Sequence, residues 1–283
     1  MYNVAIMEDG RKPIKVIEPG NRFSLKSSLS SIWQYRELLI LLSWKDGRIR
    51  YRQTAIGVLW AILQPLLAML LFVFIFGRFQ GISDTGIPYA LFVYSGLLIW
   101  QFFATGITES SNSLLENGSI ISKIYFPKII LPFAKVMTRL TNLLLSALLM
   151  VGLMLYYHYT PSLKIIIWII PIVILLTLAS ASIGAVLAAI NARFRDVQNI
   201  LPYFIQLGMF VSSAIYSPLI LGNHRWLIYF NPATGIIDLF RYALFSLPFP
   251  AHSLISSCFL TLLFLFIALF YFAKKEGVFS DII

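Results

Sequence analysis

The sequence predicts an all-α integral membrane protein with six transmembrane helices. Of its 283 residues, 59% are hydrophobic and 12% are charged, whereas soluble domains average roughly 45–50% apolar and about 25% charged residues. A soluble fold of this size cannot bury so much apolar surface, so the bilayer must solvate part of it. The single cysteine, Cys258, cannot form an internal disulfide. These observations exclude a soluble domain, a disordered chain and a disulfide scaffold.

Six stretches are apolar and long enough to cross the bilayer, which takes about 20 helical residues. They are residues 56–76, 87–107, 140–157, 165–190, 201–221 and 254–272. The first follows a long polar and amphipathic segment, so it is not a signal peptide. We therefore expect a membrane domain at residues 56–273, an amphipathic helix at 30–55, and polar tails at residues 1–29 and 274–283.

The distribution of positive charge predicts the orientation, because cytoplasmic loops are enriched in Lys and Arg. With six spans, both termini share one side with the second and fourth loops, and that side carries 18 of the 22 Lys and Arg residues. Both termini are therefore expected in the cytoplasm. The net charge of +10 is then mainly an orientation signal, and nucleic-acid binding is not expected.

Two cytoplasmic segments outside the spans have structure of their own. The basic, amphipathic helix at 30–55 is expected either to lie in the headgroup layer or to pack on its own domain. The long loop at residues 108–132 contains a short amphipathic run at 110–122, followed by Pro127 and Pro132. This loop reads either as a docking surface or as a plain linker.

The outer segment at residues 222–253 contains an apolar run, 236–245, that is too short to span the membrane. Runs of about 10–14 apolar residues are more often re-entrant or interfacial. We expect two short helices here, forming a lid over the outer end of the domain. Its candidate residues are Asp238, Phe240 and Arg241, of which the first and last are three positions apart and can pair.

The chemistry of the spans argues against an enzyme. The six stretches contain no Asp, Glu, Lys, Arg or His, although intramembrane catalysis and proton transfer generally need such groups. No catalytic motif, metal-ligand cluster or phosphate loop of the form G-x-x-x-x-G-K-[ST] occurs. We expect no catalytic residue, no metal and no cofactor, so a second subunit must supply the energy for uphill transport.

Aromatic and amide side chains recur at helical spacing in two spans. The candidate channel-lining residues are Trp60 and Gln64 in the first span, and Tyr203, Gln206, Phe210 and Ser213 in the fifth. A lipid-facing Gln would leave its amide unpaired, so these stripes should face protein or a water-filled path. A transport pathway and plain helix packing both fit this pattern. In the fourth span, Ser180, Gly184 and Ala188 follow the small-xxx-small pattern, which is mostly packing.

Several short sequence motifs are spread over residues 30–283. They are Lys45-Asp46, the run from Arg50 through Gln53 to Gln64-Pro65, Phe92-Val93-Tyr94-Ser95-Gly96-Leu97, Asn112-Ser113-Leu114-Leu115, Lys123-Ile124-Tyr125-Phe126-Pro127-Lys128, Asn191-Ala192-Arg193-Phe194-Arg195-Asp196-Val197 and Asn231-Pro232. Together they resemble the polysaccharide-export permeases of the type-2 ABC transporter family. The likeness is strongest to O-antigen exporters, with teichoic-acid and capsule permeases as near neighbours. Lys45 departs from the family, which more often has Arg there.

The resemblance implies a transport subunit of the bacterial inner membrane. Two copies would form a channel above two copies of a separate ATPase subunit, which would bind the ATP. The substrate would be an undecaprenyl-linked polysaccharide such as O-antigen, moved outward from the cytoplasmic side. A drug or small-lipid exporter of the same superfamily is an alternative. A membrane-embedded glycosyl- or acyltransferase is a further one, which the missing acid–base cluster disfavours.

The resemblance also assigns roles to particular segments. Residues 30–55 would be an interface helix, and residues 110–122 a coupling helix that receives the movement of the ATPase. The implied coupling residues are Asn112, Leu115, Glu116, Ile120 and Lys123. A pyrophosphate head group would need cations at the cytoplasmic entrance, and the candidates are Arg36, Lys45, Arg50 and Arg52. Anchoring on anionic lipid is the other explanation of these four residues.

Overall fold

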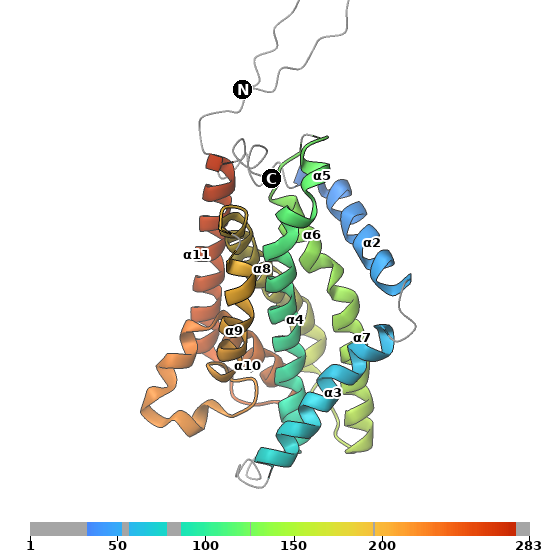
Figure 1. Ribbon diagram of the computed structural model, residues 1–283. Helices are drawn as coiled ribbons and strands as arrows, with labels where there is room; N and C mark the ends of the chain where they lie inside the picture. The colour runs from blue at the N-terminus through green and yellow to red at the C-terminus, as the bar shows by residue number, and fades with distance from the viewer. Residues whose placement is uncertain (1–32, 53–56, 78–85, 125, 195, 276–283) are drawn as a thin grey trace, which may run out of the picture.

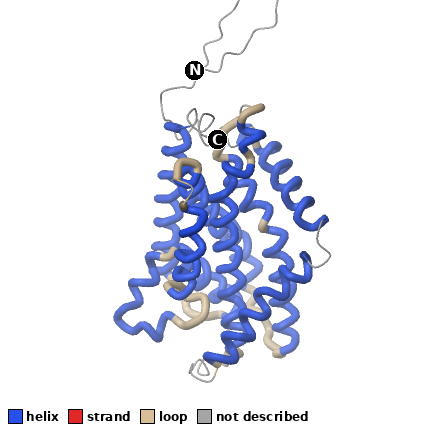
Figure 2. The backbone as a smooth tube through the Cα atoms, in the orientation of Figure 1, coloured by secondary structure: helices blue, strands red, loops and turns tan. Residues whose placement is uncertain are grey.

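The computed structural model describes residues 33–52, 57–77, 86–124, 126–194 and 196–275, and these form helices and turns without strands (Figures 1 and 2). The elements are α2 (Arg36–Arg52), α3 (Gly57–Phe76), α4 (Tyr89–Glu116), α5 (Gly118–Ile121), α6 (Ile130–Thr138), α7 (Leu140–Tyr156), α8 (Lys164–Asn191), α9 (Val197–Phe210), the 3-10 helix η2 (Pro218–Phe230), α10 (Pro232–Phe245) and α11 (Ala251–Lys275). The all-α prediction is confirmed for these residues. The expected tail at residues 1–29, and all but two residues of the tail at 274–283, lie outside them.

Four helical segments are long and apolar enough to cross a membrane. They are Tyr89–Glu116, Ile130–Tyr156, Lys164–Asn191 and Ala251–Lys274. They correspond to the second, third, fourth and sixth predicted spans, and α6 with α7 forms the third. The first predicted span contains α3, whose described apolar stretch is Leu63–Phe76. Among the described residues, four of the six predicted spans therefore have a helix long and apolar enough to cross a membrane.

The fifth predicted span, residues 201–221, is not one continuous helix. α9 ends at Phe210, and the chain turns before η2 begins. The 14 residues of α9 rise about 21 Å, which is short of the roughly 30 Å of hydrocarbon. The sequence stays apolar across this break because the turn itself is buried. Ala214 and Ile215 are 0% and 5% exposed. The prediction of a helix across residues 201–221 is therefore wrong.

α4 is the central helix of the bundle. Leu91, Val93 and Tyr94 are completely buried in its outer half, and Leu114 in its other half. α8 packs along it at the small-residue stripe, where Gly184 lies directly against Ser110 of α4. The packing role predicted for this stripe is confirmed.

α2 packs on its own domain, which is one of the two arrangements expected for it. One side lies on α6, where Ser43 Oγ donates to the Ala134 carbonyl at 3.0 Å and Thr138 Oγ1 donates to the Ser43 carbonyl at 3.2 Å. The other side leaves large apolar residues uncovered: Trp33, Ile40, Leu41 and Trp44 are all more than half exposed. A position in the headgroup layer stays a prediction, which this uncovered apolar side favours.

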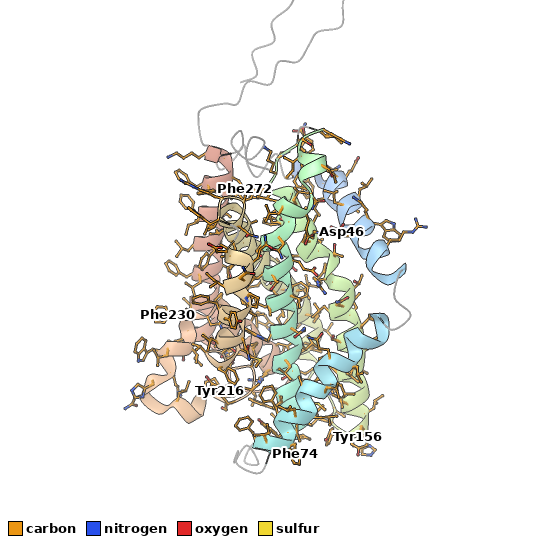
Figure 3. All side chains as sticks on the ribbon, in the orientation of Figure 1. Asp46, Phe74, Tyr156, Tyr216, Phe230 and Phe272 are labelled. Carbon is orange, nitrogen blue, oxygen red and sulfur yellow. The ribbon has the colours of Figure 1, made fainter. Side chains whose placement is uncertain are left out.

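The bundle has two distinct ends. α5 and the C-terminal end of α11 lie at one end, and the C-terminal end of α3 lies at the other (Figure 1). Figure 3 shows the same division, with Phe272 near the first end and with Phe74 and Tyr156 at the opposite one. The predicted topology puts the α5 end in the cytoplasm, and the two ends are called here the α5 end and the outer end.

Candidate functional site

The predicted coupling segment is formed by the end of α4 and by α5. Residues 110–116 continue α4 without interruption, because no helix breaker occurs before Asn117-Gly118. At that point the Asn117 side chain donates to the Ser113 carbonyl at 2.8 Å, and α5 follows as a separate helix of 4 residues. This corrects the expectation of one separate helix over residues 110–122. The predicted coupling segment is instead the tip of the central helix followed by α5.

The five implied coupling residues do not share one surface. Asn112 accepts a hydrogen bond from Asn191 of α8 at 3.0 Å, so it faces the interior. Leu115 and Ile120 are half-buried, whereas Glu116 and Lys123 are exposed. Only the last two offer charge to a partner subunit.

Ion pairs that the sequence analysis missed join α4 to its neighbours at this end. Lys135 Nζ of α6 lies 2.7 Å from a Glu116 carboxylate oxygen and 2.8 Å from a carboxylate oxygen of Asp46 in α2. Arg139, directly after α6, forms a two-point contact with Glu109 of α4, with Nε 2.6 Å from Oε2. Glu109 and Glu116 are seven positions apart, so both lie on one face of α4. Lys135 and Arg139 are four positions apart, so they also share one helix face. That spacing is the signal in the sequence that could have revealed them.

The four candidate head-group cations all belong to α2. Arg36 donates to the Trp33 carbonyl at 3.2 Å, and its guanidinium carbon lies 5.3 Å from the centre of the Trp33 ring. Lys45 is exposed, about 13 Å further along the helix axis, so these two residues do not form one compact site. The side chains of Arg50 and Arg52 lie outside the described ones.

The predicted channel stripe is only partly present. Gln64 on α3 and Tyr203, Gln206 and Phe210 on α9 are exposed in the single chain, and both helices pack against α4. Ser213 does not continue the stripe, because α9 ends at Phe210 and Ser213 is completely buried. The Trp60 side chain lies outside the described ones.

α10 is enclosed by other helices rather than laid over the outer end, which corrects the expected lid. It packs against α4, α8 and α11, and Phe240 and Arg241 are 6% and 2% exposed. The helix is buried on nearly all sides, with Ile236, Ile237 and Ala243 completely buried. Only η2, before it, is largely uncovered.

Arg241, near the outer end, is a charged side chain that is almost completely buried. Its guanidinium donates to the carbonyls of Ser213 (2.5 Å), Ala214 (2.8 Å) and Phe92 (3.0 Å), and to Ser95 Oγ (3.3 Å). It also lies over the Phe92 ring, 3.5 Å from the centre. Sequence spacing predicted a pair with Asp238, but the guanidinium donates to these oxygens instead.

Asp238, three positions before Arg241 on α10, belongs to the same buried cluster. It forms side-chain hydrogen bonds with Ser213 and Ser253. Burial raises the pKa of Asp238, while the Ser213 contact and the positive charge of Arg241 lower it. Burial lowers the pKa of Arg241 to about 9, against the raising effect of Asp238, which leaves the guanidinium charged at neutral pH.

Comparison with known proteins identifies the family. The family described as ABC-2 type transporter matches residues 37–245. An O-antigen export system permease protein RfbA from Myxococcus xanthus is 33% identical, over 65% of this chain and 70% of the relative. An RfbA from Klebsiella pneumoniae is 31% identical, over 72% and 79%. The polysialic acid transport protein KpsM of Escherichia coli is 24% identical, over 70% and 78%.

The described fold agrees with this match, since it is a helical bundle with four helices long and apolar enough to cross a membrane. The match covers well over half of the sequence and extends from α2 to the end of α10. This protein therefore belongs to the ABC-2 type transporter family.

Proposed function

We propose that this chain is the channel-forming permease subunit of an ATP-driven exporter of lipid-linked polysaccharide. The observation that carries the proposal is its similarity to O-antigen export permeases over most of both chains. The substrate class would be an undecaprenyl-linked polymer such as O-antigen, carried outward across the bacterial inner membrane. Both termini would lie in the cytoplasm, as the distribution of Lys and Arg favours.

The proposed path lies between two copies of the chain, lined by α3 and α9. The supporting residues are Gln64, Tyr203, Gln206 and Phe210, which are uncovered in the single chain. Aromatic rings present flat apolar faces on which sugar rings can stack, and amides supply both donors and acceptors for hydroxyl groups. A path without fixed charge would let a long polymer slide without a deep binding well.

The proposed motor is a separate ATPase subunit docked at the α5 end. Glu116 and Lys123 are exposed there and would contact the ATPase, while Lys135 ties Glu116 to the bundle. The cations of α2, Arg36, Lys45, Arg50 and Arg52, would attract the pyrophosphate of the lipid carrier. The uncovered tryptophans of the same helix favour a position beside the cytoplasmic leaflet.

Gene deletion in the producing bacterium tests the proposal. Loss of the chain should abolish the surface polysaccharide and leave lipid-linked polymer inside the cell, and the intact gene should restore export. A strain that keeps its surface polysaccharide would contradict the proposal. Unchanged polysaccharide together with greater sensitivity to drugs would instead favour a small-molecule exporter.

A further inference from the structure

The central helix α4 connects the two functional ends of the domain. Its 28 residues span about 42 Å. Phe92 and Ser95 lie in its first two turns, and its last residue, Glu116, lies beside α5. At the α5 end it is held by the pairs with Lys135 and Arg139. A displacement at that end is therefore carried along α4 as a rigid body.

At the outer end, Arg241 fastens α4 to the turn that follows α9. Three of its four acceptors are backbone carbonyls, one from α4 and two from the turn. Ser213 and Ala214 follow the last residue of α9, where carbonyls lack helical donors. A planar guanidinium can serve several acceptors at once, which a lysine ammonium cannot do in the same geometry.

A glycine makes this approach possible. A Cβ on Gly96 of α4 would lie 2.0 Å from the Ala214 carbonyl oxygen and 2.7 Å from Arg241 Nη2. Any side chain at this position would push α4 and the turn apart. The close approach and the arginine contact are therefore two parts of one joint.

The turn is itself tied firmly to α9. Tyr216 Oη donates to the Phe210 carbonyl at 2.6 Å, and Ser212 Oγ donates to the Met209 carbonyl at 2.7 Å. A force on Ser213 and Ala214 therefore acts on the end of α9 rather than being absorbed by a loose loop.

We propose that Arg241 is a positioning residue for transport, and that it transmits the movement of α4 to the outer end of the channel helix α9. This rests on the proposed function, in which α5 receives the ATPase movement and α9 lines the path. Ser213 is also held from α10, since its Oγ donates to the Thr234 carbonyl at 3.4 Å. Disrupting the joint should uncouple the motor from the polymer without stopping the motor.

The test uses the intact permease–ATPase complex in proteoliposomes, with polymer movement and ATP hydrolysis measured together. Arg241→Lys keeps the charge but cannot satisfy the four acceptors, and Gly96→Ala leaves Arg241 unchanged while forcing the joint open. Both variants should hydrolyse ATP at nearly the wild-type rate. The amount of polymer moved per ATP should fall by at least about threefold. Gly152→Ala, on an open face of α7, should match the wild type.

A labelling experiment separates positioning from simple stability. In a Cys258→Ser background, Phe210→Cys should react with a maleimide at a rate that ATP changes, and Arg241→Lys should abolish that change while hydrolysis continues. Unchanged polymer per ATP in both variants would overturn the proposal, as would a parallel fall of hydrolysis and transport. A wild-type complex that moves no polymer would instead count against the proposed function.

Discussion

Replacing Gly184 by alanine should loosen the main helix contact of the bundle. The new Cβ would lie 2.3 Å from the Ser110 Cβ, 2.4 Å from its Oγ and 3.4 Å from the Ile107 carbonyl. Ser110 cannot turn away freely, because its hydroxyl donates to the Pro132 carbonyl and its Cβ is fixed to α4. The two helices must therefore separate slightly.

The expected loss follows from two opposing effects. Inserting a methyl group into a packed interior costs about 1–3 kcal/mol, while Ala in place of Gly in a helix gains about 0.5–1 kcal/mol. The middle of each range gives a net loss in the free energy of unfolding of about 1 kcal/mol. Gly152, on α7, has no atom within 4 Å of an added Cβ, so Gly152→Ala should show only the gain.

The assay is thermal unfolding of the purified protein in detergent, followed by tryptophan fluorescence. Gly184→Ala should lower the midpoint by roughly 2–4 °C, and Gly152→Ala should leave it unchanged or raise it. Ser110→Gly should lower the midpoint less in the Gly184→Ala background than in the wild type, because only there does it remove colliding atoms. Equal midpoints for the two alanine variants, or an equal effect of Ser110→Gly in both backgrounds, would refute the packing argument.

Asp46→Asn should destabilise the protein by about 1 kcal/mol and Glu116→Gln by less than about 0.5 kcal/mol, since the carboxylate side chains are 24% and 52% exposed. Equal shifts in the same thermal assay would contradict this order. Glu116→Lys should reduce co-purification of the ATPase, and full recovery of the ATPase would argue against docking there. Phe210→Ala should lower polysaccharide export at unchanged membrane abundance, whereas Phe204→Ala, on another face of α9, should not. Equal export by these two variants would remove Phe210 from the path.

Hydropathy located the long helices well because it measures how apolar the side chains are, and the bilayer interior requires apolar side chains. The predicted limits of the fourth and sixth spans agree with α8 and α11 to within a few residues, and the third prediction covers α7 without α6. Hydropathy failed after Phe210, where residues 212–215 form a buried turn before η2 begins. Hydropathy cannot distinguish a backbone buried in lipid from one whose carbonyls are satisfied by a distant arginine.

The same limit applies to the candidate site. The sequence showed Arg241 in a short apolar run, and local spacing favoured a pair with Asp238. Its real acceptors lie between 27 and 149 positions away in the chain, a separation that no periodic pattern reveals. Helical spacing could predict which side chains of α9 share one face as far as Phe210. It could not predict that Ser213 leaves this face, because the end of the helix depends on those long-range contacts.

In the proposed function, this chain forms the path for a polymer and a separate ATPase subunit supplies the energy. Proteoliposomes that contain the purified chain and a fluorescent lipid-linked polysaccharide, with or without the purified ATPase subunit and ATP, test both parts together. Polymer should move only when chain, ATPase subunit and ATP are all present. Movement or ATP hydrolysis by the chain alone, or no movement by the complete system, would refute the proposed function.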